Sequence, residues 1–444
     1  MRCSLVPLIV VLGLGLLAGS ALAASPSLPD HPLTLDDCIS IALQQSPSLV
    51  IARQSVISGE ANLRSALSSY YPEAVFNATR GRTRGSSFLD TPAGTIAFST
   101  AATRREAEVL LTHTIWQTGR SQSAQQARSG LAASSANAEA TEQDLMLSIC
   151  RLYYAALAAQ QFVGVSEATV ASASDHADLV QARATVGEAA PVDVLPAEAS
   201  VANAEFALLQ ARNEADISKA YLKNEMGVPP TYPLRLAPPL ESTTRTAAPA
   251  LADALRLAMD NRPEIASINE TVASAEQGVR RAEATENGVI SLWAQYNHGI
   301  AGPQEGDSWS VVASATAFLF DGGARRAAVD SARASLRSLQ AQRQLVVNGI
   351  GLEVESALLK AQTAAESVES AEMGVGSAEA QLAAAEAKYR EGVGIFVEIL
   401  DAEEAVARAR SNRVQAVYNY QTAVVEMRRA LGLLTPWVDT GVAP

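Results

Sequence analysis

The chain has 444 residues and a formal net charge of −13, and only 18% of its residues are charged. Binding to nucleic acid needs a basic surface, so this charge balance argues against a nucleic-acid partner. Hydrophobic residues reach 48% but aromatic residues only 5%; because much of the apolar fraction is alanine, the strongest helix former, the composition predicts packed helices instead of a large aromatic core.

Residues 1–23 are predicted to be a cleavable secretory signal peptide. Arg2 supplies the positive start, Leu5–Leu17 the apolar stretch and Ala21-Leu22-Ala23 the small-residue cleavage site. An uncleaved membrane anchor is the alternative, because the apolar run approaches the roughly 18 residues that span a bilayer. No cysteine directly follows the predicted cleavage site, and Cys3 lies far upstream of it, so the sequence does not support a lipid anchor.

Both halves of the mature chain predict the same order of elements: helix, strand, strand, very long helix, turn, helix. In the first half these are a helix over Leu35–Leu67, with Pro47 near its first turns or at a kink, strands over Ala74–Gly81 and Arg105–Trp116, and helices over Gly119–Val186 and Val192–Met226. In the second half they are a helix over Leu251–Glu286, strands over Val289–His298 and Trp309–Phe320, and helices over Ala324–Arg390 and Phe396–Leu431.

The chain is predicted to be an internal duplication, because four landmarks recur in the same order. The first set is Asp37–Leu43 with Pro47, Trp116–Gly119, Gly187 with Val192–Leu195, and Met226-Gly227; the second set is Asp253–Met259 with Pro263, Phe320–Gly323, Gly392 with Val397–Leu400, and Leu431-Gly432. The predicted first repeat covers residues 24–227 and the second covers residues 251–434. A Pro-rich linker over residues 228–250 separates them, and a tail over residues 435–444 follows.

The predicted helices are too long for an ordinary globule. A helix over Ala324–Arg390 would measure roughly 100 Å at 1.5 Å per residue, and the other helices of each half, stacked end to end, match that length. Elements of uniform height predict the wall of a cylinder.

The predicted strands carry a membrane signal. In Arg105–Trp116 the side chains at Ala107, Val109, Leu111, His113 and Ile115 alternate with those at Glu106, Glu108, Leu110, Thr112 and Thr114. Alternation of mostly apolar with mostly polar residues over about ten positions is typical of a barrel strand between lipid and water. A half-buried soluble sheet is the alternative for one strand alone, but the secretion signal and the paired hairpins favour a membrane sheet.

Four strands predict an oligomer. The smallest membrane barrels have about eight strands, and lipid does not tolerate open sheet edges. Two copies would give a barrel filled by its own side chains, whereas three copies give twelve strands and leave a lumen. Beyond the signal peptide, the sequence has no uninterrupted apolar run of about 18 residues, so any crossing is predicted to be made by strands.

Three motifs resemble the TolC family of outer-membrane efflux and secretion channels, and the resemblance covers nearly all of the mature chain. They are the Leu35–Pro47 pattern, Phe318–Gly323, and Tyr389–Gly392 running into Val397–Ala402. The family implies an internally duplicated α+β membrane protein that forms a homotrimer: a twelve-stranded barrel with four transmembrane β-strands per protomer, embedded in outer-membrane lipid, and a long α-helical coiled-coil tunnel through the periplasm. It also implies a passive duct of a tripartite efflux or type I secretion system, docked through a periplasmic adaptor to an inner-membrane transporter.

The closed tip of the tunnel is where the resemblance implies a gate. Glu398 and Asp401 are three residues apart on one helix face, and three-fold symmetry would stack them as two acidic rings that favour cations. They resemble the constriction acids of the family, and Asp193 and Tyr389 match positions that latch neighbouring helices. Where that latch has an arginine, this chain has Gly394, so a less firmly latched tip is the hypothesis. The alternative is that these acids only solvate a helix end.

The sequence predicts neither an enzyme nor a cofactor or metal site. The four histidines His31, His113, His176 and His298 lack HxxxH or HExxH spacing, and no GxSxG or Walker loop occurs. The alternative function is that of a secreted periplasmic coiled-coil adaptor or scaffold without a membrane barrel, which would leave the two alternating hairpins unexplained.

Overall fold

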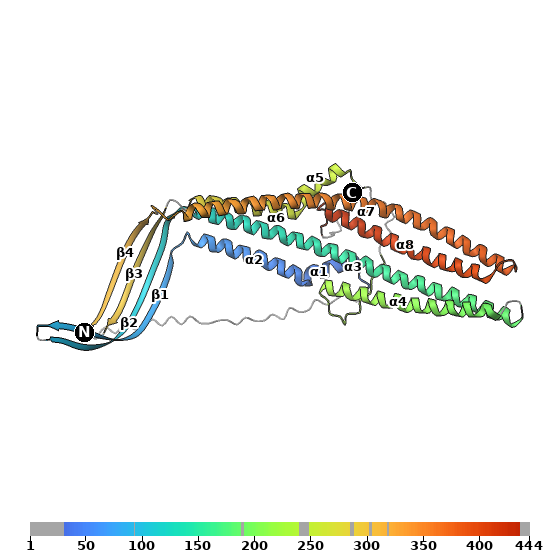
Figure 1. The fold of residues 1–444 in the computed structure, drawn as a ribbon, viewed down its shortest axis with the longest axis horizontal. Coiled ribbons are helices and arrows are strands. Elements are labelled where there is room, and N and C mark those ends of the chain that lie inside the picture. The colour runs from blue at the N-terminus through green and yellow to red at the C-terminus, as the bar shows by residue number, and fades with distance from the viewer. Residues whose placement is uncertain are drawn as a thin grey trace.

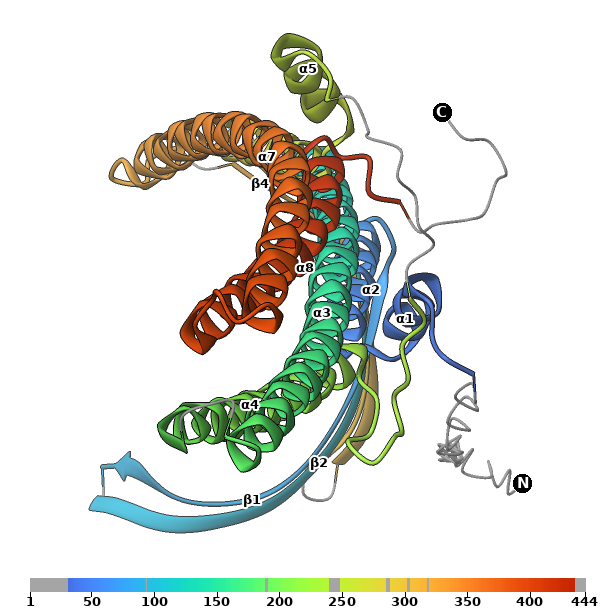
Figure 2. The same cartoon turned by 90° about the vertical axis from the view of Figure 1, so that its right-hand side faces the viewer.

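The computed structural model describes residues 31–92, 94–187, 191–238, 248–284, 288–301, 304–317 and 319–435. The signal peptide predicted over residues 1–23 and residues 436–444 of the predicted tail lie outside this range. The molecule is elongated, with a sheet at one end and long helices running away from it (Figure 1). Viewed along its length, the helices and the sheet follow one open arc (Figure 2).

The elements follow the same order in each half of the chain. The first half contains α1 (Leu35–Gln45), α2 (Pro47–Ser68), β1 (Glu73–Thr91), β2 (Gly94–Gln117), α3 (Arg120–Thr185), the 3-10 turn η1 (Pro191–Asp193) and α4 (Val194–Met226). The second half contains α5 (Leu251–Asn261), α6 (Pro263–Ala284), β3 (Val289–Ala301), β4 (Gln304–Thr316), α7 (Ala324–Arg390) and α8 (Phe396–Ala430).

The continuous helix predicted over Leu251–Glu286 is wrong, because it is broken once, and the kink allowed at Pro47 in the helix predicted over Leu35–Leu67 is a complete break between two helices. Ser46 and Arg262 adopt extended backbone, with ψ of 125° at both positions. Each precedes a proline, and a residue before proline is sterically disfavoured in the helical region. Pro47 and Pro263 therefore start new helices at the first helical position, where the missing N–H leaves no bond unmade.

The two breaks are packed against glycines that end the last helix of each half. Gly227 has a φ of +73°, and a Cβ there would lie 2.9 Å from the carbonyl oxygen of Gln45. Gly432 has a φ of +71°, and a Cβ there would lie 2.8 Å from the carbonyl carbon of Asn261. The same close backbone approach thus occurs twice in the molecule.

Substitution of either glycine by alanine is expected to destabilise the protein. Gly227→Ala and Gly432→Ala each force an L residue into a left-handed conformation and into the backbone opposite, which costs more than about 1 kcal/mol. Thermal melting of the detergent-solubilised protein measures the effect as a lower Tm. Gly130→Ala in α3 is the matched control, because a Cβ there meets nothing within 4 Å, and it should leave the Tm unchanged or raise it. Equal melting of all three variants would contradict the prediction.

The strands form one antiparallel sheet in the order β1-β2-β3-β4, so β1 and β4 are its edges. Pairing of β2 with β3 ends at Arg104↔Ala301. Pairing of β1 with β2 continues beyond that level, from Arg82↔Thr103 to Thr91↔Gly94. The first hairpin is therefore a two-stranded ribbon at its outer end, roughly 30 Å long at the usual rise per residue.

None of the four predicted strands has the bounds observed. The strand predicted over Arg105–Trp116 begins at Gly94, the one predicted over Val289–His298 ends at Ala301, and the one predicted over Trp309–Phe320 begins at Gln304. The strand predicted over Ala74–Gly81 continues to Thr91, through a run of arginine, glycine and serine that carries no apolar alternation. The strand predicted over Trp309–Phe320 ends at Thr316. A register shift between Thr114 and Trp116 takes Ile115 out of the β2–β3 pairing, so the predicted alternation of β2 is interrupted there.

One face of the sheet is apolar and aromatic. The register aligns four side chains in a row across the strands, and we call this set the aromatic row: Phe76, Val109, Tyr296 and Trp309. All four are exposed, with Trp309 at 78%. The next positions along each strand lie on the opposite face, where Asn77 and Gln295 both donate hydrogen bonds to Glu108, at 3.3 and 2.6 Å. The two faces therefore suit an apolar and an aqueous medium.

A buried ionic network ties the helices together midway along their length. Arg429 on α8 is 2% exposed and donates to Asp144 on α3 at 2.7 Å and to Glu264 on α6 at 2.5 Å. Arg262, 5% exposed, donates to Glu264 at 2.9 Å and to Glu353 on α7 at 2.6 Å. Burial opposes ionisation of Glu264, but hydrogen bonds from both arginines outweigh it and lower its pKa to about 2.

Candidate functional site at the tip of the long helices

The ends of four helices meet at the tip farthest from the sheet (Figure 1). α3 and α7 end there, at Thr185 and Arg390, and α4 and α8 begin there, at Val194 and Phe396. All four residues predicted for the gate lie in this part of the chain: Glu398, Asp401, Asp193 and Tyr389. The predicted site is thus one region of the structure.

A tight glycine turn connects α7 to α8. Gly392 has a φ of +75°, and the carbonyl oxygen of Lys388 accepts hydrogen bonds from the amides of Val393 at 3.0 Å and Gly394 at 3.1 Å. Such paired bonds complete the carbonyls left open at a helix end. A Cβ at position 394 would lie 3.0 Å from Cβ of Lys388 and 3.1 Å from the amide nitrogen of Tyr389. Gly394 therefore leaves no room for an arginine unless the turn moves.

Tyr389 is buried inside the protomer, with 8% of its surface exposed. The guanidinium of Arg183, on the last turn of α3, lies 4.9 Å above its ring, and Nη1 of Arg183 donates to the carbonyl oxygen of Tyr389 at 3.1 Å. The ring centroid of Phe396 lies 5.8 Å away. These contacts fasten α3 to the turn between α7 and α8.

Tyr389 belongs to a small apolar cluster that holds the tip together. The buried members, which we call the tip cluster, are Val180, Ala197, Ala385, Tyr389, Phe396, Ile399 and Ala402. They come from α3, α4, α7 and α8. Hydrophobic burial therefore joins both helix pairs at this end.

The three acids lie around the tip cluster, and none of them has a partner among the described residues. The side chains of Glu398 and Asp401 are exposed on α8, and Asp193 is half-buried in η1. The part of the chain that the structure describes gives none of these carboxylates a hydrogen bond or ion pair. Nor does any described contact link Asp193 to Tyr389. The acids are thus available to water, ions or a neighbouring protomer.

Sequence reasoning missed several polar contacts near the tip. Arg183 lies in a different helix, far along the chain from Tyr389, and only its position in the last turn of a predicted helix singles it out. His176 lies on α3 with Nε2 at 3.3 Å from Glu403 and 3.8 Å from Glu386. The hydroxyl of Ser172 donates to Glu403 at 2.5 Å. These polar contacts join α3 to α7 and α8 just behind the tip cluster.

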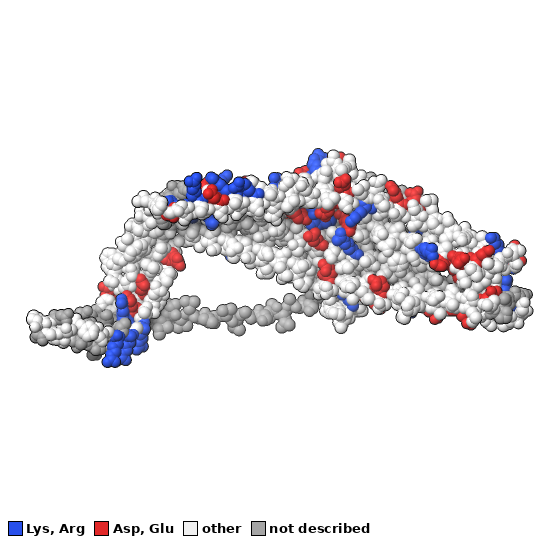
Figure 3. Space-filling view, in the orientation of Figure 1, with Lys and Arg blue, Asp and Glu red and all other residues white. Residues whose placement is uncertain are grey.

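Acidic and basic side chains gather at opposite ends of the molecule. Figure 3 shows acidic atoms gathered near the tip, and a basic patch at the opposite end, over the hairpin of β1 and β2. Within the described residues no group of three or more histidine, cysteine or acidic side chains is arranged to hold a metal ion.

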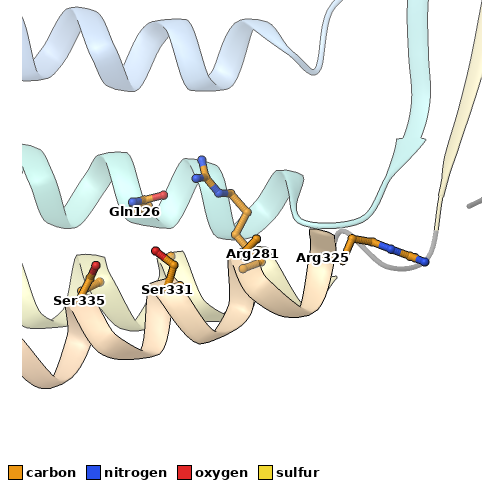
Figure 4. A pocket seen from close by; sticks show the side chains of 10 residues that line it. Gln126, Arg281, Arg325, Ser331 and Ser335 are labelled. Carbon is orange, nitrogen blue, oxygen red and sulfur yellow. The ribbon is translucent and has the colours of Figure 1, made fainter. Parts of the chain in front are cut away.

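A pocket of about 520 Å³ lies near the sheet end of the helices, between α3, α6 and α7. Most of its lining residues are alanine, glycine or serine. Figure 4 shows Ser331 and Ser335 on α7 facing Gln126 on α3, and Arg325 at the end nearest the sheet. Arg325 pairs with Asp321 at 2.8 Å. Small side chains at such a groove let another helix approach closely.

No described helix combines the length and the apolar character needed to cross a bilayer.

Comparison with known proteins gives a consistent family match. The pattern of the family described as outer membrane efflux protein matches residues 38–228 and 254–433. The chain is 29% identical over 408 residues to Protein CyaE of Bordetella pertussis, covering 90% of this chain and 84% of that protein. It is 23% identical over 433 residues to outer membrane efflux protein BepC of Brucella suis, with coverage of 95% and 89%. The solved structure of the outer-membrane channel OprN has the same fold, with a TM-score of 0.78 at 20% identity, covering 90% of this chain and 89% of that one.

Proposed function

The chain belongs to the outer membrane efflux protein family, and from that membership we propose that three copies form the duct of a tripartite efflux or type I secretion system. As a member of this family it is a passive channel of the outer membrane with a helical tunnel in the periplasm, and not an enzyme. The proposal concerns how many copies assemble, what gates the duct and what docks to it.

The open edges of the sheet carry the trimer proposal. β1 and β4 each have a partner strand on one side only within the chain, and a sheet edge cannot remain unpaired in lipid. Pairing β1 of one copy with β4 of the next joins three sheets into a closed set of twelve strands, enough to surround a lumen. The open arc of Figure 2 supports this arrangement, because an arc of helices continues the same wall below the sheet.

The tip supports a gate made of acids. In a trimer, Glu398 and Asp401 would each form a ring of three carboxylates, which favours cations and hinders anions. Asp193 has no partner within the described part of its own chain, so a latch partner would belong to the neighbouring protomer. The tip is also the surface that an adaptor from the inner-membrane transporter would meet. The duplicated chain supports the proposed repeats over residues 24–227 and 251–434, joined by the linker over 228–250.

Single-channel recording in planar bilayers tests the gate. If Asp193 forms a latch hydrogen bond worth about 1 kcal/mol, Asp193→Ala should raise the ratio of open to closed states about fivefold. Asp216→Ala is the matched control, because Asp216 is an exposed acid of α4, the helix that follows Asp193, and lies far from the tip. It should behave like the wild type. Unchanged gating in Asp193→Ala would remove the latch role.

Cell fractionation separates the proposed duct from the scaffold alternative. A heat-modifiable trimer in the outer-membrane fraction supports the duct. A water-soluble periplasmic product that forms no channels would support a coiled-coil scaffold and would end the proposal.

A further inference from the structure

Four arginines lie together on the first hairpin, outward of the aromatic row. We call them the arginine patch: Arg80, Arg82 and Arg84 on β1 and Arg105 on β2. Side chains alternate between faces along a strand, so residues 76, 80, 82 and 84 share one face. Arg105 is paired with Arg80, which places it there too. Figure 3 shows a basic region over β1 and β2, the two strands that carry the patch.

Three arginines of the patch, Arg80, Arg82 and Arg105, have no compensating charge among the residues that the structure describes. Arg80 and Arg105 are directly opposite each other, and like charges in that position destabilise a sheet. The described residues give Arg80, Arg82 and Arg105 no ion pair or hydrogen-bond partner through their side chains. The nearby Arg104 is different, because it lies on the other face and pairs with Glu106 at 3.2 Å. An outside anion would relieve the repulsion.

The surface beside the patch is hollowed. An open pocket of about 400 Å³ is lined by Ala78, Thr79, Arg80, Arg105, Glu106, Ala107 and His298. The carboxylate of Glu106 is already paired with Arg104, on the opposite face of the sheet. His298 is engaged with Asp307 at 2.6 Å, which leaves the two guanidinium groups as the cations of this pocket. Guanidinium groups bind phosphate oxygens in bidentate fashion, so a pocket with two of them suits a phosphate.

The position of the patch along the strand fixes which phosphate it would meet. Aromatic side chains of membrane sheets gather at the boundary between hydrocarbon and headgroups. Arg80 is four residues beyond Phe76 on β1, roughly 13 Å farther along the strand and on the side away from the helices (Figure 1). The face is the same apolar face that carries the aromatic row. The arginines therefore lie at the level of headgroups, turned toward lipid.

We propose that the arginine patch binds the phosphate groups of lipid in the leaflet of the outer membrane that faces the exterior. This inference rests on the proposed placement of the sheet in the bilayer. The phosphates of the bound lipid supply the negative charge that Arg80, Arg82 and Arg105 lack among the described residues. They also fix the depth of the sheet and stabilise the start of the two-stranded ribbon.

Lipid binding by the intact assembly tests the proposal. The wild-type protein and the variant Arg80→Gln, Arg82→Gln, Arg105→Gln are purified in detergent, and native mass spectrometry measures how much bisphosphorylated lipid A each retains. The triple variant should bind at least tenfold more weakly. Lipid A with its phosphates removed should bind the wild type no better than the triple variant does. Inorganic phosphate at the same concentration should not displace the lipid, because the acyl chains of the lipid would also bury exposed apolar side chains of the same face, such as Phe76 and Val109.

Arg104→Gln is the matched control, since it removes one arginine from the opposite face of the same strand. It should retain the lipid like the wild type. Equal retention by the triple variant, or equal loss in Arg104→Gln, would overturn the proposal.

The single variant Arg82→Gln can be tested if the triple variant does not assemble. It should weaken lipid binding about threefold, and unchanged binding would contradict the proposal. Channel formation by the same variants in planar bilayers distinguishes the lipid-binding proposal from the proposed duct function. A variant that loses lipid binding but conducts normally is consistent with the duct. A wild-type protein that forms no channels would contradict the duct function.

Discussion

Glu264→Gln is expected to reduce the free energy of unfolding by about 3 kcal/mol, the effect of breaking a buried ion pair by removing one partner. The substitution leaves Arg429, 2% exposed, with Asp144 alone, and Arg262, 5% exposed, with Glu353 alone. Chemical unfolding of the detergent-solubilised protein, followed by helical circular dichroism, measures the difference.

The matched control is Glu404→Gln on α8. Glu404 is 70% exposed and pairs with Arg408 one turn away, and exposed pairs of this kind contribute about 0.5 kcal/mol or less. If the two variants unfold alike, the network at Glu264 does not hold the helices together.

The same carboxyl gives the network a defined dependence on pH. The pKa of Glu264 is lowered from 4.5 to about 2 in the folded protein, so its ionised form favours folding. This contribution is complete above the unfolded pKa, near 4.5, and is lost as the pH falls through the folded pKa, near 2. The wild type should therefore lose stability more steeply across this window than Glu264→Gln does. Parallel pH profiles would contradict the low pKa.

The double variant Glu398→Gln, Asp401→Asn is expected to lower the ratio of cation to anion permeability about fivefold, because a trimer loses six carboxylates at its narrowest level. The reversal potential across a KCl gradient at low ionic strength measures this ratio. The difference between variant and wild type should shrink in 1 M salt, where charges are screened within about 3 Å.

Removal of an acid from the other end of the helices provides the control for that experiment. Asp330→Asn on α7 changes an exposed carboxylate near the sheet, where the proposed duct has no constriction, and should leave the reversal potential unchanged. A double variant that retains wild-type selectivity would mean that the acids only solvate the start of α8.

The long helices could be predicted because residues close to their ends mark where they begin and end. The bounds predicted for α7, Ala324–Arg390, are those observed, since a continuous alanine-rich stretch lies between glycines with positive φ at Gly323 and Gly392. The breaks at Ser46 and Arg262 were harder to predict from the sequence. Proline is as compatible with an early helical position as with a break, and the contact with a glycine far along the chain is visible only in the fold.

The strands show why a pattern can end before the structure does. Alternation indicates a strand only where the two faces meet different media. Beyond Gly81 the first hairpin passes into arginine, glycine and serine, so no alternation remains even though pairing continues to Thr91. The alternating part of each hairpin was therefore predicted as strand, whereas the ribbon beyond Gly81 was not predicted, although its two strands are paired.

The tip was predictable in location and not in contacts. The repeated Gly-to-Leu motif places Glu398, Asp401 and Asp193 at helix ends, which the structure brings to one region. Tyr389, however, is fastened by Arg183 from a helix in the other half of the chain. A contact between helices in different halves depends on their relative rotation, and the mainly alanine faces of α3 and α7 leave that rotation undetermined by sequence.

The ribbon formed by the outer part of β1 and β2 has a consequence for how a cell presents this protein. In a trimer, three such ribbons would extend beyond the rest of the sheet. Each would be stabilised only by the hydrogen bonds between its own two strands. Antibodies and bacteriophages arriving from the medium would meet these first. A foreign peptide grafted at their summit would be displayed on living bacteria, with the channel wall beneath left undisturbed.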